Sequence, residues 1–440
     1  MRVTVVGGGL AGSECALQLA ARGIDVDLFE QRPDRTSPAH KTDGFAELVC
    51  SNSLKSTKPE SAAGMLKQEL SLYGSKLIGF AYDTRVAAGG ALAVDRTLFS
   101  DAVTGAILAS PHITVHREEV TSIPEGPAVI AAGPLCSEHL FKALCDRLGE
   151  AHLSFFDAAA PIVDAETIDM DRAFRASRYD DGEVGDYLNC PMERDEYFAF
   201  VSELVAAQRV IGHDFESKDL FQACQPVEEV ARTGEMSLAY GALKPVGLVD
   251  PHTGRRPFAV VQLRSENASC TAYNLVGFQT NLTFPEQARV FRMIPGLEHA
   301  EFFRYGVMHR NSFVDSPHVL GRGFSIPGTD VLLAGQITGT EGYVEAIASG
   351  LYAALNMYAR LKELPDPELP VTTAFGSLVA YASDPACENY QPMHVNFGVF
   401  PPLEKHIRSK SDRKAAYAQR GIADARAFVE SRPDLFGIGA

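Results

Sequence analysis

The chain has 440 residues, 46% of them hydrophobic, which is enough apolar material for about two or three domain cores. Its 40 Lys and Arg residues against 56 Asp and Glu residues give a net charge of −16, which repels a nucleic-acid backbone at long range. We find no run of about 18 apolar residues, and a strand is expected immediately after Met1. These features argue against a signal peptide or a membrane span, and we expect a cytoplasmic protein.

The first predicted element is a short apolar strand that ends at Val6 and leads into a glycine loop. The loop has the pattern G-x-G-x-x-G and consists of Gly7, Gly8, Gly9, Leu10, Ala11 and Gly12. Glycines suit a tight turn, a close approach of backbone to phosphate and close packing of a helix on a strand. A helix over 13–22 then presents its positive N-terminal end to the anion.

A second predicted strand, over 24–29, ends on Glu30, which follows Gly12 by 18 residues. A carboxylate in that position can accept hydrogen bonds from ribose hydroxyls. Strand, glycine loop, helix, strand and acid therefore occur in the order of a dinucleotide-binding unit. NAD, FAD and S-adenosylmethionine proteins all use such a unit, so the N-terminal pattern does not identify the ligand.

The C-terminal half contains a second group of candidate cofactor contacts. An apolar strand over 331–336 leads into a turn and an alanine-rich helix, and a strand over 128–132 ends at a glycine that suits a close crossing beneath a nucleotide. Because FAD is long and needs contacts from both ends of a chain, we expect FAD. Tyr343 can stack on the flavin or on a pterin, or simply pack. These candidates are Gly133, Gly335, Gln336, Gly342 and Tyr343.

The predicted fold class is α/β, with a Rossmann-like FAD-binding domain built on a doubly wound parallel sheet. Residues 1–165 and 305–440 are expected to form this domain, and residues 166–304 to form a smaller inserted α+β domain for the substrate. Strand-like runs over 258–263 and 271–276 favour strands in the insertion.

Two of the eight cysteines have unusual surroundings. The sequence has no C-x-x-C pair and no zinc-ligand spacing, so we expect neither a disulfide framework nor a metal site. Cys50 follows an apolar run and has Lys41 and Lys55 nearby, and cations favour a thiolate. Cys224 lies just ahead of Pro226, at a loop or strand end. Free cysteine is also a common core residue, so both roles stay open on these residues alone.

The whole chain resembles the folate- and FAD-dependent tRNA uracil-5-methyltransferase family. The resemblance lies in VVGGGLAGSE, HKTDGFAELVCSNSLKS, FQACQPVEE, GLVDPHTGRRPFAVVQLR and LLAGQITGTEGYVEAIASG. A sister family that modifies the wobble uridine of tRNA shares the glycine loop and GQITGTEGY, but not CSNSLKS or ACQPVE. The sister family also has a C-terminal region that binds a GTPase, and for this chain we expect no obligate protein partner.

The resemblance implies an enzyme that forms 5-methyluridine in the T-loop of tRNA. It places Cys50 as the nucleophile that adds to uracil C6 and Cys224 as the base that removes the C5 proton, although the two roles can be exchanged. NAD(P)H would reduce FAD, and the reduced flavin would pass the methylene group of 5,10-methylenetetrahydrofolate to C5 and complete its reduction. Reduced folate and tRNA are thus the expected partners.

Binding of tRNA to a chain of net negative charge calls for a local basic patch. Residues 405–414, extended to Arg420, contain six Lys or Arg residues and one Asp, and a second group of arginines is expected to line one helical face. The candidate RNA contacts are Arg172, Arg175, Arg178, Arg408, Lys410 and Arg413.

Three alternatives stay open. The same chemistry can act on a ribosomal RNA uridine, because the choice of RNA depends on surface shape. An FAD-dependent oxidoreductase acting on a small substrate would use the same flavin site without Cys50 or Cys224. A flavin-holding RNA-binding module would bind RNA without forming a methyl group.

Overall fold

One of the two larger sheets in the computed structural model is a parallel sheet of five strands. The structure describes residues 1–37, 39–149, 153–178, 185–210, 225–388 and 390–437. Neighbouring strands follow the order β16-β7-β1-β2-β6, and all four pairs are parallel. Covering elements on both faces leave Val3 and Val5 of β1 fully buried. The strands are β1 (Arg2–Val6), β2 (Asp25–Phe29), β6 (Ile113–His116), β7 (Ala128–Ile130) and β16 (Val331–Leu333).

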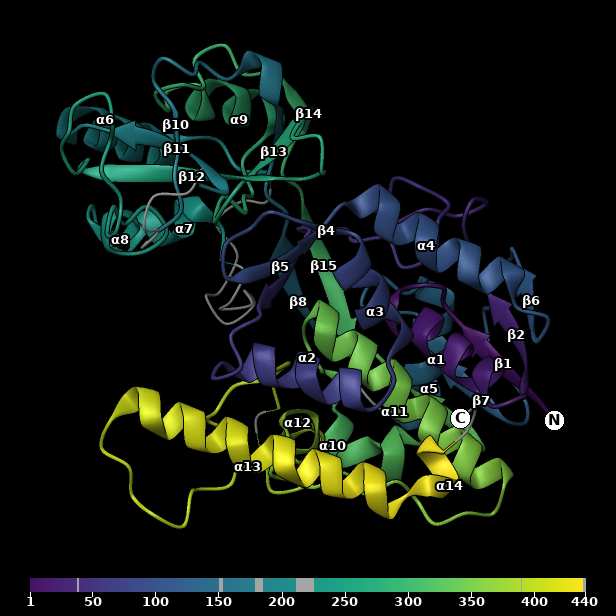
Figure 1. The fold of residues 1–440 in the computed structure, drawn as a ribbon. Coiled ribbons are helices and arrows are strands. Elements are labelled where there is room, and N and C mark those ends of the chain that lie inside the picture. The colour runs from purple at the N-terminus through teal and green to yellow at the C-terminus, as the bar shows by residue number, and fades with distance from the viewer. Residues whose placement is uncertain (38, 150–152, 179–184, 211–224, 389, 438–440) are drawn as a thin grey trace.

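Two helices, α1 (Leu10–Ala21) and α11 (Tyr343–Leu361), run side by side beside this sheet (Figure 1). A Cβ atom on Gly350 would lie 2.1 Å from the carbonyl oxygen of Ala11, so the two backbones are in close contact. The first helix begins three residues before the predicted start, because extended Gly9 is its N-cap. Further helices around this sheet are α2 (Ala62–Leu72), α3 (Lys76–Asp83), α4 (Arg96–Ala109), α5 (Glu138–Leu148), α10 (Ser316–Val319), α12 (Ala374–Tyr381), α13 (Lys410–Ser431) and α14 (Pro433–Phe436).

A second, antiparallel sheet of six strands has a hydrophobic core of its own. Its order is β10-β11-β12-β13-β9-β14, and β12 and β13 match the two predicted strand runs. Its strands and helices are β9 (Ile162–Asp164), β10 (Phe174–Arg175), β11 (Tyr187–Met192), β12 (Ala259–Ser265), β13 (Ala272–Leu275), β14 (Phe302–Arg304), α6 (Arg194–Ala206), α7 (Val227–Arg232), α8 (Ser237–Tyr240) and α9 (Phe284–Phe291). The α/β fold class is thus confirmed. Because β9 precedes residue 166, the sheet begins before the predicted insertion, whose boundaries stay a prediction.

Two small sheets lie between the larger ones (Figure 1). One pairs β8 (Leu153–Ala158) with β15 (Met308–Phe313) in antiparallel register. The other contains β3 (Ser53–Ser56), β5 (Ala91–Val94) and β4 (Arg85–Val86). None of the helices in the described ranges combines the length and apolar content that a bilayer span needs.

Candidate functional site

The glycine loop has the geometry of an anion cradle. Gly7 has a φ of +102°, and a Cβ atom there would lie 2.5 Å from the carbonyl oxygen of Ala131. A Cβ atom on Gly12 would lie 1.8 Å from the carbonyl oxygen of Gly7. Gly9 caps α1 without a side-chain hydrogen bond, so the N–H groups of the first turn remain available to a phosphate. This loop therefore fits a dinucleotide pyrophosphate.

Glu30, at the end of β2, is a buried carboxylate that the surrounding donors keep ionised. Its Oε2 accepts the N–H of Gly8 at 2.9 Å, and its Oε1 accepts the Arg32 Nε–H at 2.9 Å and the Arg32 backbone N–H at 3.0 Å. Burial raises the pKa of Glu30, but the hydrogen bonds and charge of Arg32 and the Gly8 N–H outweigh it and lower the pKa overall. A carboxylate has about four acceptor positions, so Glu30 can still bind a ribose hydroxyl.

Arg32 also lines the cofactor cleft, and the sequence reasoning missed it. Its side chain is 2% exposed and also donates to the carbonyl oxygen of Thr42 at 3.0 Å and to Glu47 Oε2 at 3.1 Å. An arginine two residues after the strand-ending acid was the available signal. It ties the strand end to the 42–47 segment.

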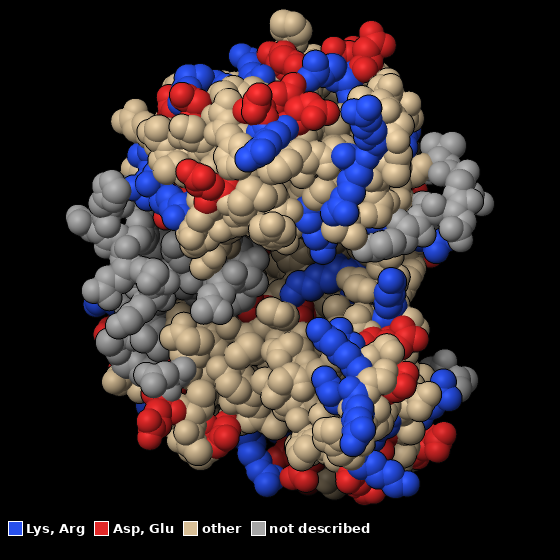
Figure 2. Space-filling view, turned by 90° about the vertical axis from the view of Figure 1, so that its left-hand side faces the viewer, with Lys and Arg blue, Asp and Glu red and all other residues tan. Residues whose placement is uncertain are grey.

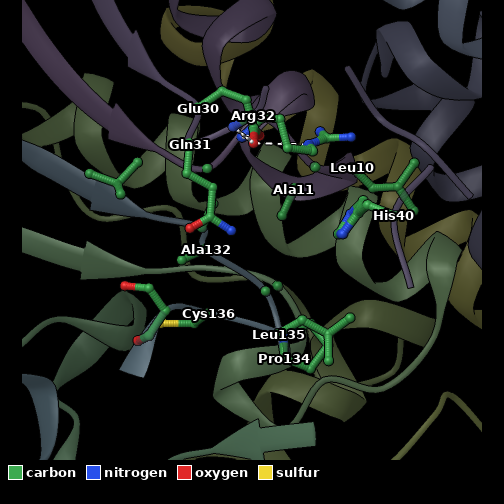
Figure 3. A pocket seen from close by; sticks show the side chains of 18 of the residues that line it. Leu10, Ala11, Glu30, Gln31, Arg32, His40, Ala132, Pro134, Leu135 and Cys136 are labelled. Atoms are coloured by element: carbon green, nitrogen blue, oxygen red, sulfur yellow. Dashed lines mark hydrogen bonds and ion pairs between the residues drawn. The ribbon is translucent and has the colours of Figure 1, made fainter. Parts of the chain in front are cut away.

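Most of the predicted cofactor residues line one cleft, shown in Figure 3. Glu30 and Arg32 lie on one side of it, with Pro134, Leu135 and Cys136 across from them. The cleft is open to solvent and is lined by the glycine loop, the end of β2 and the 131–137 segment, so it is elongated along the elements expected to contact a dinucleotide. The predicted residues that line it are Gly7, Gly8, Gly9, Leu10, Ala11, Glu30, Gly133, Gly335, Gln336 and Tyr343.

A second cavity adjoins this cleft, and Cys50 is one of the residues that line it. The two share lining residues, among them Val49, Gln336 and Tyr343, so they lie next to each other. Cys50 is half-buried and forms no disulfide within the described ranges. Other residues that line this second cavity are Ser51, Lys55, Gln279, Asn311, Glu341, Gly342 and Glu345. A long cofactor in the cleft would thus end beside Cys50.

Tyr343, the first residue of α11, contacts the loop that carries Cys50 through its hydroxyl oxygen. That oxygen accepts the Cys50 N–H at 2.7 Å and the Ser51 N–H at 3.2 Å. Burial raises the pKa of the Tyr343 phenol, with the nearby Cys50 adding to the effect, so the group stays protonated. The sequence reasoning considered only the ring of Tyr343 and missed this contact.

The expected cations near Cys50 have separate locations. Lys55 lines the Cys50 cavity, and its Nζ lies 3.8 Å from Oε1 of Glu345. Lys41 lines a different pocket, together with Arg96 and Arg304. The cations that bond to the Cys50 loop are these two arginines, which the sequence reasoning did not single out.

Cys224 lies outside the described residues, but the segment after it is anchored to the Cys50 cavity wall. The N–H of Val227 donates to the carbonyl oxygen of Gln279 at 2.7 Å. The fully buried Glu228 accepts the Asn281 N–H at 2.7 Å and the Thr280 hydroxyl at 2.9 Å. Burial raises the pKa of Glu228 to about 7, against the opposing effect of these donors.

The expectation that Arg172, Arg175 and Arg178 share a helical face is wrong. Arg175 belongs to β10, where Phe174 and Arg175 pair with β11, and the other two lie in turns. Sheet pairing overrides the helix-like spacing. Arg172 pairs with Glu196 at 2.7 Å, Arg175 donates to the Tyr273 hydroxyl at 2.8 Å, and Arg178 donates to the carbonyl oxygens of Lys244 and Val246.

The other RNA candidates, Arg408, Lys410 and Arg413, are exposed at the start of α13. Figure 2 shows a hollow between the upper and lower parts of the molecule, with Lys and Arg side chains along a line that crosses it. No group of metal-ligating side chains occurs within the described ranges.

Comparisons with known proteins agree with this geometry. The family model described as "Glucose inhibited division protein A" matches residues 2–365. A Geobacter sulfurreducens protein named "Methylenetetrahydrofolate--tRNA-(uracil-5-)-methyltransferase TrmFO" is 53% identical, over 96% of this chain and 97% of that protein. A Desulforudis audaxviator protein of the same name is 52% identical over 98% of both. The structure of Aquifex aeolicus GidA has a TM-score of 0.69 at 15% identity, covering 99% of this chain and 75% of that one, which shows a shared fold.

Proposed function

Because the chain belongs to the methylenetetrahydrofolate--tRNA-(uracil-5-)-methyltransferases, within the glucose inhibited division protein A family, we propose that it methylates C5 of a uridine in the tRNA T-loop. The one-carbon donor is 5,10-methylenetetrahydrofolate, and the cofactor is FAD reduced by NAD(P)H. The observation that carries the proposal is that the cavity lined by Cys50 lies directly beside the dinucleotide cleft and shares lining residues with it.

The residues of the cleft fit FAD. The uncapped first turn of α1 and the Gly7–Gly9 backbone hold the pyrophosphate, and Glu30 binds a ribose. Gly133, Gly335 and Gln336 line the same cleft, and Gln336 also lines the Cys50 cavity. When bound and reduced, FAD supplies the one-carbon transfer and the electrons that complete the methyl group.

Cys50 activates the uracil. Its thiolate adds to C6, and the electrons of the C5–C6 double bond move to O4, which gives an enolate whose C5 is nucleophilic. After C5 bonds to the one-carbon unit, a base removes the C5 proton and the C6–S bond breaks to release the thiolate. We assign the base to Cys224. The described residues Val227 and Glu228, which follow it in the sequence, bond to residues 279–281, of which Gln279 lines the same cavity.

The basic start of α13 supports a tRNA-binding surface. Lys410 and Arg413 lie in the first turn, where cations are disfavoured by the helix dipole. Phosphates near this end would be attracted by both the dipole and the side chains. The line of cations across the hollow in Figure 2 agrees with a polyanion that spans both parts of the molecule.

The experiment is transfer of label from radiolabelled methylenetetrahydrofolate, with NADPH, into unmodified tRNA transcript, followed by nucleoside analysis. Wild type is expected to give labelled 5-methyluridine in the T-loop, and Cys50→Ala and Cys224→Ala to give none while keeping their flavin. A reducible flavin without any label in RNA would favour the oxidoreductase alternative. Label in ribosomal RNA but not in tRNA would move the same chemistry to the other substrate.

A further inference from the structure

Three consecutive carbonyl groups of the Cys50 loop, defined as residues 48–51, accept hydrogen bonds from two arginines. Arg96 donates from Nη1 to the Leu48 oxygen at 2.7 Å and from Nη2 to the Cys50 oxygen at 3.1 Å. Arg304 donates from Nη2 to the Val49 oxygen at 2.7 Å. Arg96 is the first residue of α4 and Arg304 the last of β14, so the loop is held from both halves of the fold.

The opposite face of the loop is fixed as well. Tyr343 accepts the N–H groups of Cys50 and Ser51. The next residue, Asn52, is fully buried, donates to the carbonyl oxygens of Val94 and Ser265, and accepts the Arg264 Nε–H at 2.9 Å. The position of the Cys50 backbone is therefore determined on both sides.

The two arginines differ in their charge partners. Arg96 forms an ion pair with Glu266. Burial lowers the pKa of Arg96, but Glu266, Tyr343 and Cys50 outweigh it and raise the pKa overall. Arg304 has no ion pair within the described ranges, and its buried Nε has no hydrogen-bond partner there. Burial and the neighbouring charge of Arg96 lower the pKa of Arg304, while Tyr343, Cys50 and the Glu47 carboxylate act in the opposite direction.

A half-buried cation that forms no ion pair, as Arg304 is among the described residues, is costly for a folded protein. The cost at Arg304 is reduced when the Cys50 sulfur is a thiolate, because the two groups then carry opposite charges. The same attraction favours the thiolate, which is the reactive form of cysteine.

We propose that Arg96 and Arg304 are positioning residues for the Cys50 thiol, which hold its loop through three carbonyl groups and supply the positive charge that stabilises its thiolate. The inference deepens the proposed function and rests on it for the role of Cys50 in methyl transfer. Thiol reactivity is measured without tRNA or folate, so the arginine effect is tested separately from the reaction.

The test is the rate of Cys50 alkylation by iodoacetamide in the flavin-loaded protein, followed at this residue by peptide mass spectrometry. Arg304→Gln is expected to slow alkylation at pH 7 by about fivefold, because one cation is lost. Arg304→Lys keeps the charge and is expected to fall between that variant and wild type. Glu266→Gln leaves the Arg96 charge uncompensated and is expected to speed alkylation by about twofold or more.

The two variants are expected to change the alkylation rate in opposite directions, which distinguishes an electrostatic effect on the thiol from a loosening of the loop. A purely structural role would loosen the loop in both the Arg304→Gln and the Glu266→Gln variant and shift both rates in the same direction, which would overturn the proposal. Arg322→Gln is the matched control: it removes an arginine that is 76% exposed and pairs only with surface acids among the described residues, and its rate should equal that of wild type.

Methyl transfer supplies the second readout. Arg304→Gln is expected to lower kcat with little change in KM for the folate, and Arg304→Lys to restore part of it. If wild type transfers no methyl group while the alkylation rates follow the predicted signs, the proposed function fails and the arginine effect stands. Equal alkylation rates in wild type, Arg304→Gln and Glu266→Gln would refute the arginine effect whatever the methyl transfer shows.

Discussion

At the scale of single residues, Glu30 and Tyr343 show what a local pattern can and cannot predict. The spacing from the glycine loop predicted the position of Glu30 at the end of β2, because the strand, loop and helix are contiguous in sequence. The contact between the Tyr343 hydroxyl and Cys50 joins residues 293 positions apart and follows from the packing of α11 against the Cys50 loop. No spacing in the sequence carries that information.

Tyr343→Phe tests the hydroxyl contact. The change leaves the N–H groups of Cys50 and Ser51 without their acceptor, so we expect a loss of about 1–3 kcal/mol in the free energy of unfolding. Because the loop loses its fixed position, kcat for methyl transfer should fall as well. Denaturant unfolding and steady-state kinetics check the two effects, and an unchanged kcat at full flavin content would contradict the role.

Glu228→Gln tests the buried carboxyl group behind the Cys50 cavity. Burial raises its folded-state pKa from an ordinary value of 4.5 to about 7, so the folded protein binds the extra proton between these values. The stability that this proton provides is fully present below pH 4.5 and is lost as the pH rises through about 7.

Between pH 5 and pH 8, the Tm of wild type should therefore fall more than the Tm of Glu228→Gln, as measured by circular dichroism. The control is Asp412→Asn, because Asp412 is exposed in α13 and does not contact the cavity. The Tm of this variant should change with pH as that of wild type does. Parallel Tm curves for wild type and Glu228→Gln would contradict the assignment.

At the scale of elements, hydrophobic patterning predicted β1, β2, β7 and β16, and the structure confirms these four strands. The fifth parallel strand, β6, was not predicted. Patterning failed for residues 172–178, where arginines spaced like a helical face lie in β10 and in turns, because pairing with β11 decides the conformation. The close packing of α1 on α11 depends on Gly350, whose contact partner Ala11 lies in the other half of the chain. The sequence predicted an alanine-rich helix near the cofactor, but not its packing on α1.

Gly350→Ala should push α1 and α11 apart and widen the glycine cradle. Because the added Cβ meets backbone at 2.1 Å, we expect a destabilisation of about 1–3 kcal/mol and loss of bound flavin. Gly105→Ala is the matched control in α4, where the Cβ meets nothing within 4 Å, and it should stabilise the protein by about 0.5–1 kcal/mol. Flavin absorbance and thermal unfolding report both outcomes, and full flavin retention in Gly350→Ala would refute the packing argument.

At the scale of the whole molecule, the candidate site forms where the two halves of the fold meet. Residues of the parallel sheet region supply the cleft, and Gln279 and Arg304, from the antiparallel part, reach the Cys50 cavity and loop. The sequence predicted both parts and the cysteine, because each is signalled by contiguous residues. It could not predict Arg96, Arg304 or Gln279, because their roles depend on how distant segments are placed together.

Replacing both Arg408 and Arg413 with Glu tests the tRNA surface. Loss of two phosphate contacts should weaken binding to every tRNA, whatever its sequence. It should also reduce the slope of log affinity against log salt concentration by about 1.4–1.8. Methyl transfer to saturating tRNA should stay near wild type. Arg322→Glu is the control for reversing the charge of an exposed arginine outside this surface. Equal salt slopes for the double variant and wild type would place the RNA elsewhere.

The most direct test of the Cys50 assignment is to trap the enzyme on tRNA that contains 5-fluorouridine in the T-loop. Fluorine cannot leave as the C5 proton does, so a thiol that has added to C6 stays bound after C5 has accepted the one-carbon unit. We predict a covalent complex that depends on methylenetetrahydrofolate and NADPH, with the RNA attached to the peptide containing Cys50 and absent in Cys50→Ala. Attachment to any other cysteine, or a complex that persists in Cys50→Ala, would contradict the account.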